Sequence, residues 1–295
     1  MAKGKSILVL AVVGAILLAA GFFGAKFMAK NVAEQKVKEF FADMDEVAHA
    51  EYSDVEVELF SRRAVIRDMD IVIMGGKSVK VKEFVLSRYE EKDGQPYALN
   101  AEFRGVTLPV TEELFEDAAP ELRRMGYDIL YCDYAMDYAY DEKTQLFEVN
   151  GVSLGVEDAG KLSFSLKMSN VDMQALAKQD SAKAMLMAIN GATLQYSDAS
   201  LMNRLFKTIA EDQNSSEQVL IDEMNLGLDK EIATAEEAQQ AFTVTALKEV
   251  KKFLNARKGI KLTLAPDQPV AVLSLLGVQD PADAVQMLNI KVQAD

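Results

Sequence analysis

The sequence predicts an α+β fold in which an N-terminal transmembrane helix precedes a large antiparallel meander sheet with helices covering one face. Three observations predict this fold. An uncharged run, Ser6 to Ala25, lies near the start; segments with alternating apolar and polar residues follow it; and helical periodicity dominates the last part. Because short turns join the alternating segments, we expect neighbouring strands to pair antiparallel.

The run 6–25 is long enough to cross a bilayer as a helix. At about 1.5 Å per residue it would extend roughly 30 Å, the thickness of the hydrocarbon core. The alternative is a cleaved signal peptide, whose apolar region is usually shorter. Cleavage after Ala25 would also leave the bulky Phe23 where a small residue is required. We therefore expect residues 1–30 to form a basic stretch and an uncleaved anchor.

Lysines flank the run on both sides, so the positive-inside rule favours neither orientation. Spans that follow a short basic stretch commonly act as signal-anchors, which leave the following domain outside the cytoplasm. We expect a single-pass protein of the inner, cytoplasmic membrane, with residues 51–295 in the periplasm. Apolar residues at helical spacing from Val32 to Val47 predict a juxtamembrane helix over 31–50.

The β-rich part of the domain, 51–170, alternates with a period of two. The strands that this alternation predicts lie at about 55–59, 65–73, 79–85, 99–103, 132–140, 147–149, 152–156 and 162–168. Gly75-Gly76 and Asn150-Gly151 are typical of the turns between paired strands. A short helix over 111–124, which Thr111 can cap, interrupts the strands.

The helix-rich part, 171–295, contains several capping signals for helix starts. The predicted helices lie at about 172–189, 198–209, 216–229, 235–257 and from Pro281 onward. The predicted strands lie at 194–197, 260–265 and 288–294. Because no low-complexity linker separates this part from the β-rich part, one continuous sheet with helices on its apolar face is the simplest arrangement.

The composition argues against nucleic-acid binding and against most classes of enzyme. A formal net charge of -14 repels phosphate, so we expect no nucleic-acid partner. Cys132 and His49 are the only cysteine and histidine, which excludes a Cys-rich zinc site. The Walker A, G-x-G-x-x-G, H-E-x-x-H and C-x-x-C motifs are also missing from the sequence. We expect no metal, no cofactor and no catalytic activity.

Two patterns resemble functional sites but are better explained without a function. The G-x-S-x-G pattern at 151–155 would need a following helix and a downstream histidine, whereas its surroundings are strand-turn-strand and His49 lies upstream. Asp133, Asp137 and Asp141 share a strand face. Successive aspartates in this set are four residues, or roughly 13 Å, apart, so the three carboxylates cannot bind one ion together.

One strand carries the strongest candidate for a binding surface. Its apolar face consists of Tyr134, Met136, Tyr138 and Tyr140. Tyrosine suits an apolar groove because its ring can be buried while its hydroxyl finds a partner, but it suits a core under the helices equally well. We take these four residues as the candidate ligand-binding face, with core packing as the alternative.

Several segments together carry a family resemblance. Besides the single N-terminal span they are Asn150-Gly151-Val152-Ser153-Leu154, Leu162-Ser163-Phe164-Ser165-Leu166-Lys167, the run Ala192 to Leu201, and Leu288-Asn289-Ile290-Lys291-Val292. In these segments the chain resembles bacterial inner-membrane-anchored envelope proteins of the YdgA-like and AsmA-like type. The resemblance implies a long curved sheet in the periplasm and, for AsmA-like members, an association with envelope lipid homeostasis and outer-membrane integrity.

We therefore expect a membrane-anchored, non-enzymatic envelope protein that binds lipid or another apolar ligand. Its expected partners are the membrane, through residues 6–25, and lipid or other envelope proteins. Two alternatives stay open. A closed core would favour a structural or interaction scaffold without a ligand, and two acidic side chains converging in one cleft would favour a hydrolase that uses carboxylates alone.

Overall fold

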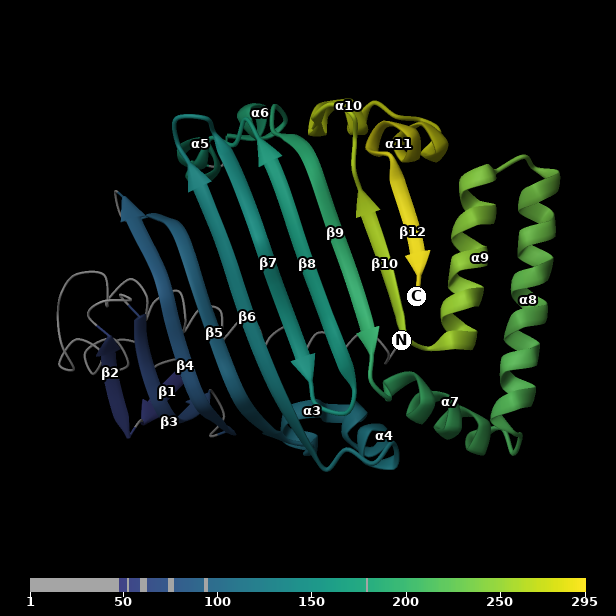
Figure 1. Ribbon diagram of the computed structural model, residues 1–295, viewed down its shortest axis with the longest axis horizontal. Helices are drawn as coiled ribbons and strands as arrows, with labels where there is room; N and C mark the ends of the chain where they lie inside the picture. The colour runs from purple at the N-terminus through teal and green to yellow at the C-terminus, as the bar shows by residue number, and fades with distance from the viewer. Residues whose placement is uncertain (1–47, 52, 59–62, 74–76, 93–94, 179) are drawn as a thin grey trace. The chain divides into compact units, whose positions relative to one another are not determined.

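The structure is a computed structural model (Figure 1). It describes residues 48–295 except 52, 59–62, 74–76, 93–94 and 179. The predicted anchor at 6–25, and the predicted juxtamembrane helix as far as residue 47, lie outside the described residues. In the part of the chain that is described, no helix is long and apolar enough to cross a membrane.

The chain forms two compact units. The first contains the residues up to Ala139 together with 152–157, and the second contains 140–151 and 158–295. Two long strands, β6 (Ile129–Asp141) and β7 (Leu146–Val156), contribute residues to both units. The large antiparallel sheet that the sequence predicts is confirmed, and each unit contains a part of it.

The first unit is built from antiparallel strands, of which the long ones pair in sequence order. Besides β6, these strands are β1 (Ala48–Glu51), β2 (Asp54–Glu58), β3 (Arg63–Ile73), β4 (Lys77–Lys92) and β5 (Gln95–Pro109). They hydrogen-bond in the order β1-β3-β4-β5-β6, and β2 pairs with a separate part of β3. The short helices α3 (Glu112–Phe115), η1 (Glu116–Ala118) and α4 (Ala119–Arg124) connect β5 to β6.

Two predictions about the first unit need correction. The helix predicted up to residue 50 is wrong for its last three residues, because Ala48 to Ala50 pair with β3 in strand β1. This pairing satisfies backbone groups along the edge of β3, which the helical spacing of the preceding residues could not indicate. The single helix predicted over 111–124 is interrupted at Glu116, whose φ of 48° lies in the left-handed region and ends α3.

The core of the first unit is a packed, apolar sheet face. The register aligns side chains across β4, β5 and β6 in two rows, Val81-Val106-Cys132 and Phe84-Phe103-Tyr134, all of them buried. The Phe84 and Phe103 rings lie 4.7 Å apart between centroids, tilted by 40°. Aligned apolar rows of this kind are what holds neighbouring strands in one register, because a slip by one residue would turn every side chain to the other face.

The thiol of Cys132 should be almost unreactive in the folded protein. Burial and the neighbouring Asp133 carboxylate raise its pKa to about 12. At pH 8 about one such thiol in 10⁴ is ionised, against roughly a quarter of free cysteine. Because the thiolate is the reactive form, and its higher nucleophilicity at raised pKa offsets only part of the lost fraction, we expect labelling by a disulfide reagent at pH 8 to be at least about tenfold slower in native buffer than in guanidinium. Similar rates in both conditions would contradict the buried position.

The second unit continues the antiparallel pairing with shorter strands. These strands are β8 (Gly160–Ser169), β9 (Ala188–Asp198), β10 (Gly259–Leu264), β11 (Val270–Ala271) and β12 (Ile290–Ala294). They follow β7 in the order β8-β9-β10-β12, and β11 pairs with the start of β9. The helices are α5 (Met173–Ala177), α6 (Ser181–Ala184), α7 (Leu201–Asp212), α8 (Glu217–Glu237), α9 (Ala241–Ala256), α10 (Val272–Leu276) and α11 (Pro281–Leu288).

Two predictions about the second unit are wrong. Asn150-Gly151 does not form a turn but lies inside β7, because pairing along its 11 residues satisfies more backbone groups than a hairpin of two short strands. The helix predicted over 172–189 is two short helices followed by β9. Asp172 caps the first, as predicted, by accepting a hydrogen bond from the Ala175 N–H, but Asp180 caps a second helix from the Lys183 N–H.

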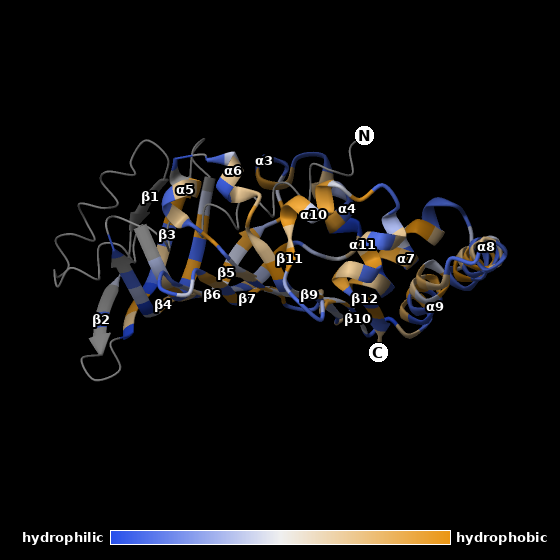
Figure 2. Cartoon of the chain, turned by 90° about the horizontal axis from the view of Figure 1, so that it is seen from above, coloured by the Kyte–Doolittle hydropathy of each residue, from blue (hydrophilic) through white to orange (hydrophobic). Residues whose placement is uncertain are grey.

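Helices α7, α8 and α9 form a small core of their own. Its buried residues are Phe206, Leu220, Ile221 and Leu254, and Met202, Ile209, Leu228 and Val250 pack around them. In Figure 2 polar and apolar residues are intermixed along α8 and α9. The buried residues of this core come from all three helices, so part of the apolar surface of each helix packs against the other two.

Helix α9 also protects the edge of the sheet. Among the described strands, β12 is the last in the hydrogen-bonded order, and α9 lies beside it (Figure 1). The Ala294 N–H donates to Glu249 Oε2 at 2.7 Å, and Lys252 Nζ donates to the Ala294 carbonyl. Two side chains of one helix thus take the place that a further strand would occupy at this residue.

Candidate functional site

The register of the second unit places twelve apolar side chains on one face of the sheet. Directly paired residues of antiparallel strands project to the same side, and each strand contributes alternate residues. The three rows, read from β8 through β9 and β10 to β12, are Leu162-Tyr196-Ile260-Ala294, Phe164-Leu194-Leu262-Val292 and Leu166-Ala192-Leu264-Ile290. We call these twelve residues the apolar grid.

The opposite face of the same strands is polar. Its side chains, in the same register, are Lys161, Ser163, Ser165 and Lys167 on β8, Thr193, Gln195 and Ser197 on β9, Lys261 and Thr263 on β10, and Lys291 and Gln293 on β12. The four strands therefore form a one-sided sheet. Such a sheet is stable in water only when its apolar face is covered by protein or by a ligand.

Much of the apolar grid remains accessible. Leu162 is 44% exposed, Leu194 is 42% exposed and Phe164 is 36% exposed. The other members are half-buried, apart from the buried Ala294. Three large apolar side chains that touch across neighbouring strands are an unusual surface for a soluble domain, because contiguous exposed apolar patches normally mark a binding surface.

The helices explain why the grid is open. Helix α9 contacts β10 and β12, and its Phe253 ring meets the Tyr196 ring at one corner of the grid, with centroids 6.1 Å apart and planes at 80°. Because α9 runs along the edge strand and α8 packs against α9, this pair leaves Phe164 and Leu194 exposed. Among the described helices, α9 thus contacts the grid at that corner, and covering of the whole apolar face by helices stays a prediction.

The tyrosines that the sequence singles out lie elsewhere. Tyr134 and Tyr138 are buried in the first unit, each 7% exposed, and Met136 beside them is half-buried. Burial raises the pKa of Tyr138 to about 12 and raises the pKa of Tyr134 further. Tyr140 is buried in the second unit, where its hydroxyl donates to the Val171 carbonyl at 2.7 Å. Ligand binding by these four residues stays a prediction.

The other sequence patterns acquire simple structural explanations. Ser153 lies inside strand β7, with no helix after it. Asp133 accepts a hydrogen bond from the Gly105 N–H at 2.8 Å, and Asp141 accepts one from the Lys143 N–H at 2.9 Å, which lowers the pKa of Asp141. The Asp133 carboxylate thus holds an irregularity inside β5, and the Asp141 carboxylate holds the turn after β6. Among the described residues, no group of three or more His, Cys, Asp or Glu could hold a metal ion.

Comparison with known proteins finds a match for the C-terminal part of the chain. Residues 153–295 match a family model described as an uncharacterized protein. The match includes β8, β9, β10 and β12, and therefore the whole apolar grid. No curated protein matches the chain.

The sequence predicts strands at most positions of the grid, but the strand predicted at 194–197 is shorter than β9, and the grid is not predicted as a site. The alternation at 162–168 and 260–265 indicates strands with one apolar face. Whether such a face is covered depends on where the helices pack, and an amphipathic helix has the same periodicity against a sheet as against another helix. The open face therefore had no signal of its own in the sequence.

Proposed function

We propose that this protein is a membrane-anchored, non-enzymatic envelope protein that binds lipid or another apolar ligand on the apolar grid. The observation that carries the proposal is the exposure of Leu162, Phe164 and Leu194 on β8 and β9, on a face whose twelve side chains include no polar group other than the Tyr196 hydroxyl. That hydroxyl is already bonded, because it donates to Asp198 Oδ1 at 2.6 Å.

The size of the grid indicates the kind of ligand. Fully burying a large apolar side chain contributes about 1.5–3 kcal/mol, and these three side chains have roughly two fifths of that surface left to bury. Covering them alone would contribute about 2–4 kcal/mol, less than the roughly 4 kcal/mol of even millimolar binding. A ligand must therefore extend over the half-buried residues of neighbouring rows, which suits a long acyl chain better than a small apolar molecule.

The run 6–25 supports the location that we propose. A single-pass anchor in the inner membrane would hold the sheet near a supply of lipid, and the resemblance to YdgA-like and AsmA-like envelope proteins points to the periplasmic side. We propose no catalytic role for the domain. The scaffold alternative is favoured by one observation, the packed apolar face of the first unit around Phe103 and Tyr134.

Tryptophan fluorescence offers a direct test, because the natural chain contains no tryptophan. In Phe164→Trp the new indole would lie on the grid, and in Ser163→Trp it would lie one residue away on the polar face. With the full chain in nanodiscs, we expect added dibromostearate to quench Phe164→Trp saturably by at least about half and Ser163→Trp hardly at all, since bromine quenches only on contact.

The two variants together decide the outcome. Equal quenching in both would show non-specific partitioning of the fatty acid, and no quenching in either would contradict the proposal. Leu194→Ser, combined with Phe164→Trp, should weaken the quenching several-fold without changing the circular dichroism spectrum, because Leu194 pairs with Phe164 and is already partly exposed.

A further inference from the structure

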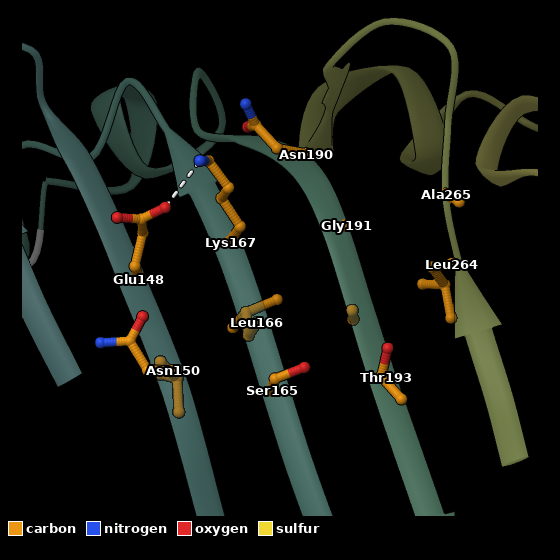
Figure 3. A pocket seen from close by; sticks show the side chains of 12 residues that line it. Glu148, Asn150, Ser165, Leu166, Lys167, Asn190, Gly191, Thr193, Leu264 and Ala265 are labelled. Carbon is orange, nitrogen blue, oxygen red and sulfur yellow. Dashed lines mark ion pairs between the residues drawn. The ribbon is translucent and has the colours of Figure 1, made fainter. Parts of the chain in front are cut away.

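The polar face of the second unit contains a hollow that the apolar grid does not use. It has a volume of about 360 Å³, within the range of small-ligand sites, and strands β7, β8, β9 and β10 supply its lining (Figure 3). Six of its residues carry the argument: Glu148, Ser165, Lys167, Asn190, Gly191 and Thr193.

An irregularity in the strand pairing creates the hollow. Lys167 pairs with Gly191, but the next residue of β8, Met168, pairs with Ile189, so Asn190 is an extra residue in β9. A bulge of this kind redirects a side chain, here that of Asn190 toward the hollow (Figure 3). Gly191 next to it has no side chain to fill the space, and a Cβ there would lie 3.3 Å from the Leu264 carbonyl oxygen.

Several side chains that line the hollow can form further hydrogen bonds with a ligand. Ser169 Oγ donates to Asn190 Oδ1 at 2.8 Å, which fixes the amide and leaves its NH₂ group to donate. Ser165 and Thr193 are direct cross-strand partners, and in the described part of the chain neither hydroxyl makes a hydrogen bond. Hydroxyls can both donate and accept, so this pair suits a ligand that does the same.

The charges in the hollow favour a neutral ligand. Lys167 Nζ and Glu148 Oε1 form an ion pair at 2.6 Å, shown by the dashed line in Figure 3. An anion would have to compete with Glu148 for the ammonium group, and a zwitterion such as an amino acid would have to separate the pair. A neutral ligand leaves the ion pair intact. It can still form hydrogen bonds with the second carboxylate oxygen of Glu148 and with the remaining N–H groups of Lys167.

We propose that this hollow is a binding site for a neutral, polyhydroxylated ligand of the saccharide class. The adjacent hydroxyl groups of a sugar match the Ser165 and Thr193 hydroxyls, the Asn190 amide and the paired charges. The apolar C–H face of a sugar ring matches the methyl group of Ala265, which follows β10 and lines that side of the hollow. The site lies on the face opposite the apolar grid, so the two proposals stand independently.

The test uses the full chain in nanodiscs and two neutral probes, maltotetraose and tetra-N-acetylchitotetraose. We expect saturation-transfer NMR signals from at least one probe. Ser165→Tyr, which fills the hollow, should weaken that binding at least tenfold. Ser163→Tyr is the matched control, because it lies two residues away on the same strand face but outside the hollow, and it should bind as the natural chain does.

Three results would overturn the saccharide site. They are no signal from either probe, equal binding by Ser165→Tyr and Ser163→Tyr, and tighter binding of free glutamine or of an oligogalacturonate than of the neutral probes. Thr193→Val, which keeps the shape but removes a hydroxyl, should weaken binding about fivefold and decides the matter if Ser165→Tyr does not fold. Quenching of Phe164→Trp by dibromostearate should survive Thr193→Val, so failure of one site is distinguishable from failure of the other.

Discussion

Replacing Phe206 with alanine is expected to lower the free energy of unfolding of the second unit by about 3–5 kcal/mol. Phe206 is 3% exposed and packs with Leu220, Ile221 and Leu254 at the meeting point of α7, α8 and α9. The Arg257 guanidinium also lies over its ring, 4.9 Å from the centroid, and loses that contact in the variant. Urea denaturation followed by circular dichroism measures the change.

Val219→Ala is the matched control for this prediction. Val219 lies on the same helix as Leu220 but is 46% exposed, so its truncation should cost less than about 1 kcal/mol. If Phe206→Ala were no more destabilising than Val219→Ala, the three helices would not share a core. The explanation for the open apolar grid would then lose its basis.

Replacing Glu249 with alanine is expected to destabilise the sheet edge by about 1–3 kcal/mol and to cause self-association. The Ala294 N–H would lose its acceptor in a residue that is 0% exposed, and an unsatisfied buried donor carries its full desolvation cost. The loss would also uncover the edge of β12 as a template for another strand. Urea denaturation and size-exclusion chromatography with light scattering measure the two effects.

An exposed ion pair on α9 provides the comparison. Lys248 bonds to Glu236 at 2.9 Å, and both side chains are more than half exposed. Lys248→Ala should therefore cost less than about 1 kcal/mol and leave the chain monodisperse. A monodisperse Glu249→Ala variant with the stability of Lys248→Ala would show that α9 does not protect this edge.

The strands were predictable because one physical rule governs them along the chain. A sheet with one apolar face imposes alternation, and the segments predicted at 65–73, 162–168 and 260–265 coincide with β3, β8 and β10. Local caps were predictable for a similar reason. Asp280 accepts a hydrogen bond from the Ala282 N–H at 2.9 Å and begins α11 at Pro281, as the sequence indicates.

Helix boundaries were less predictable, because a residue such as threonine can either cap a helix or lie in its interior. Thr234 and Glu237 have the spacing of a capping box, which predicts a helix start near 235. In the structure Thr234 lies inside α8, and its hydroxyl donates to the Lys230 carbonyl at 3.0 Å. A threonine in a helix interior can make this bond four residues back, so spacing alone does not separate a cap from an interior position.

Glycines were also assigned the wrong role in one case. The basic residues Arg257 and Lys258 followed by Gly259 predict a helix end with Gly259 as its cap. In the structure α9 ends at Ala256, and its C-cap residue Arg257 itself adopts a left-handed φ of 51°. Gly259 begins β10, where an added Cβ would lie 2.5 Å from Asp295 Oδ2 and 3.2 Å from the Tyr196 carbonyl oxygen. Its role is to permit close approach of the strands, which only the tertiary structure reveals.

Both proposed sites depend on events that local sequence does not encode. The apolar grid is open because α7, α8 and α9 pack on one another, and the hollow exists because β9 contains one extra residue at Asn190. A helix's choice of partner does not change the periodicity of its own sequence, and the bulge shifts the alternation of β9 only at Asn190, where the sequence predicts the end of a helix. The same alternation would have fitted a covered, regular sheet.

The position of α7, α8 and α9 between β9 and β10 in the chain also constrains synthesis on the ribosome. Strand β9 emerges after β8 and the two short helices α5 and α6, and it can pair with β8 at once, but its other neighbour, β10, follows only when α7, α8 and α9 have been made. Until then one side of β9 has unpaired backbone groups, next to Leu194 and Tyr196. The nascent chain therefore passes through a stage with an open strand edge, the kind of intermediate that chaperones protect from aggregation.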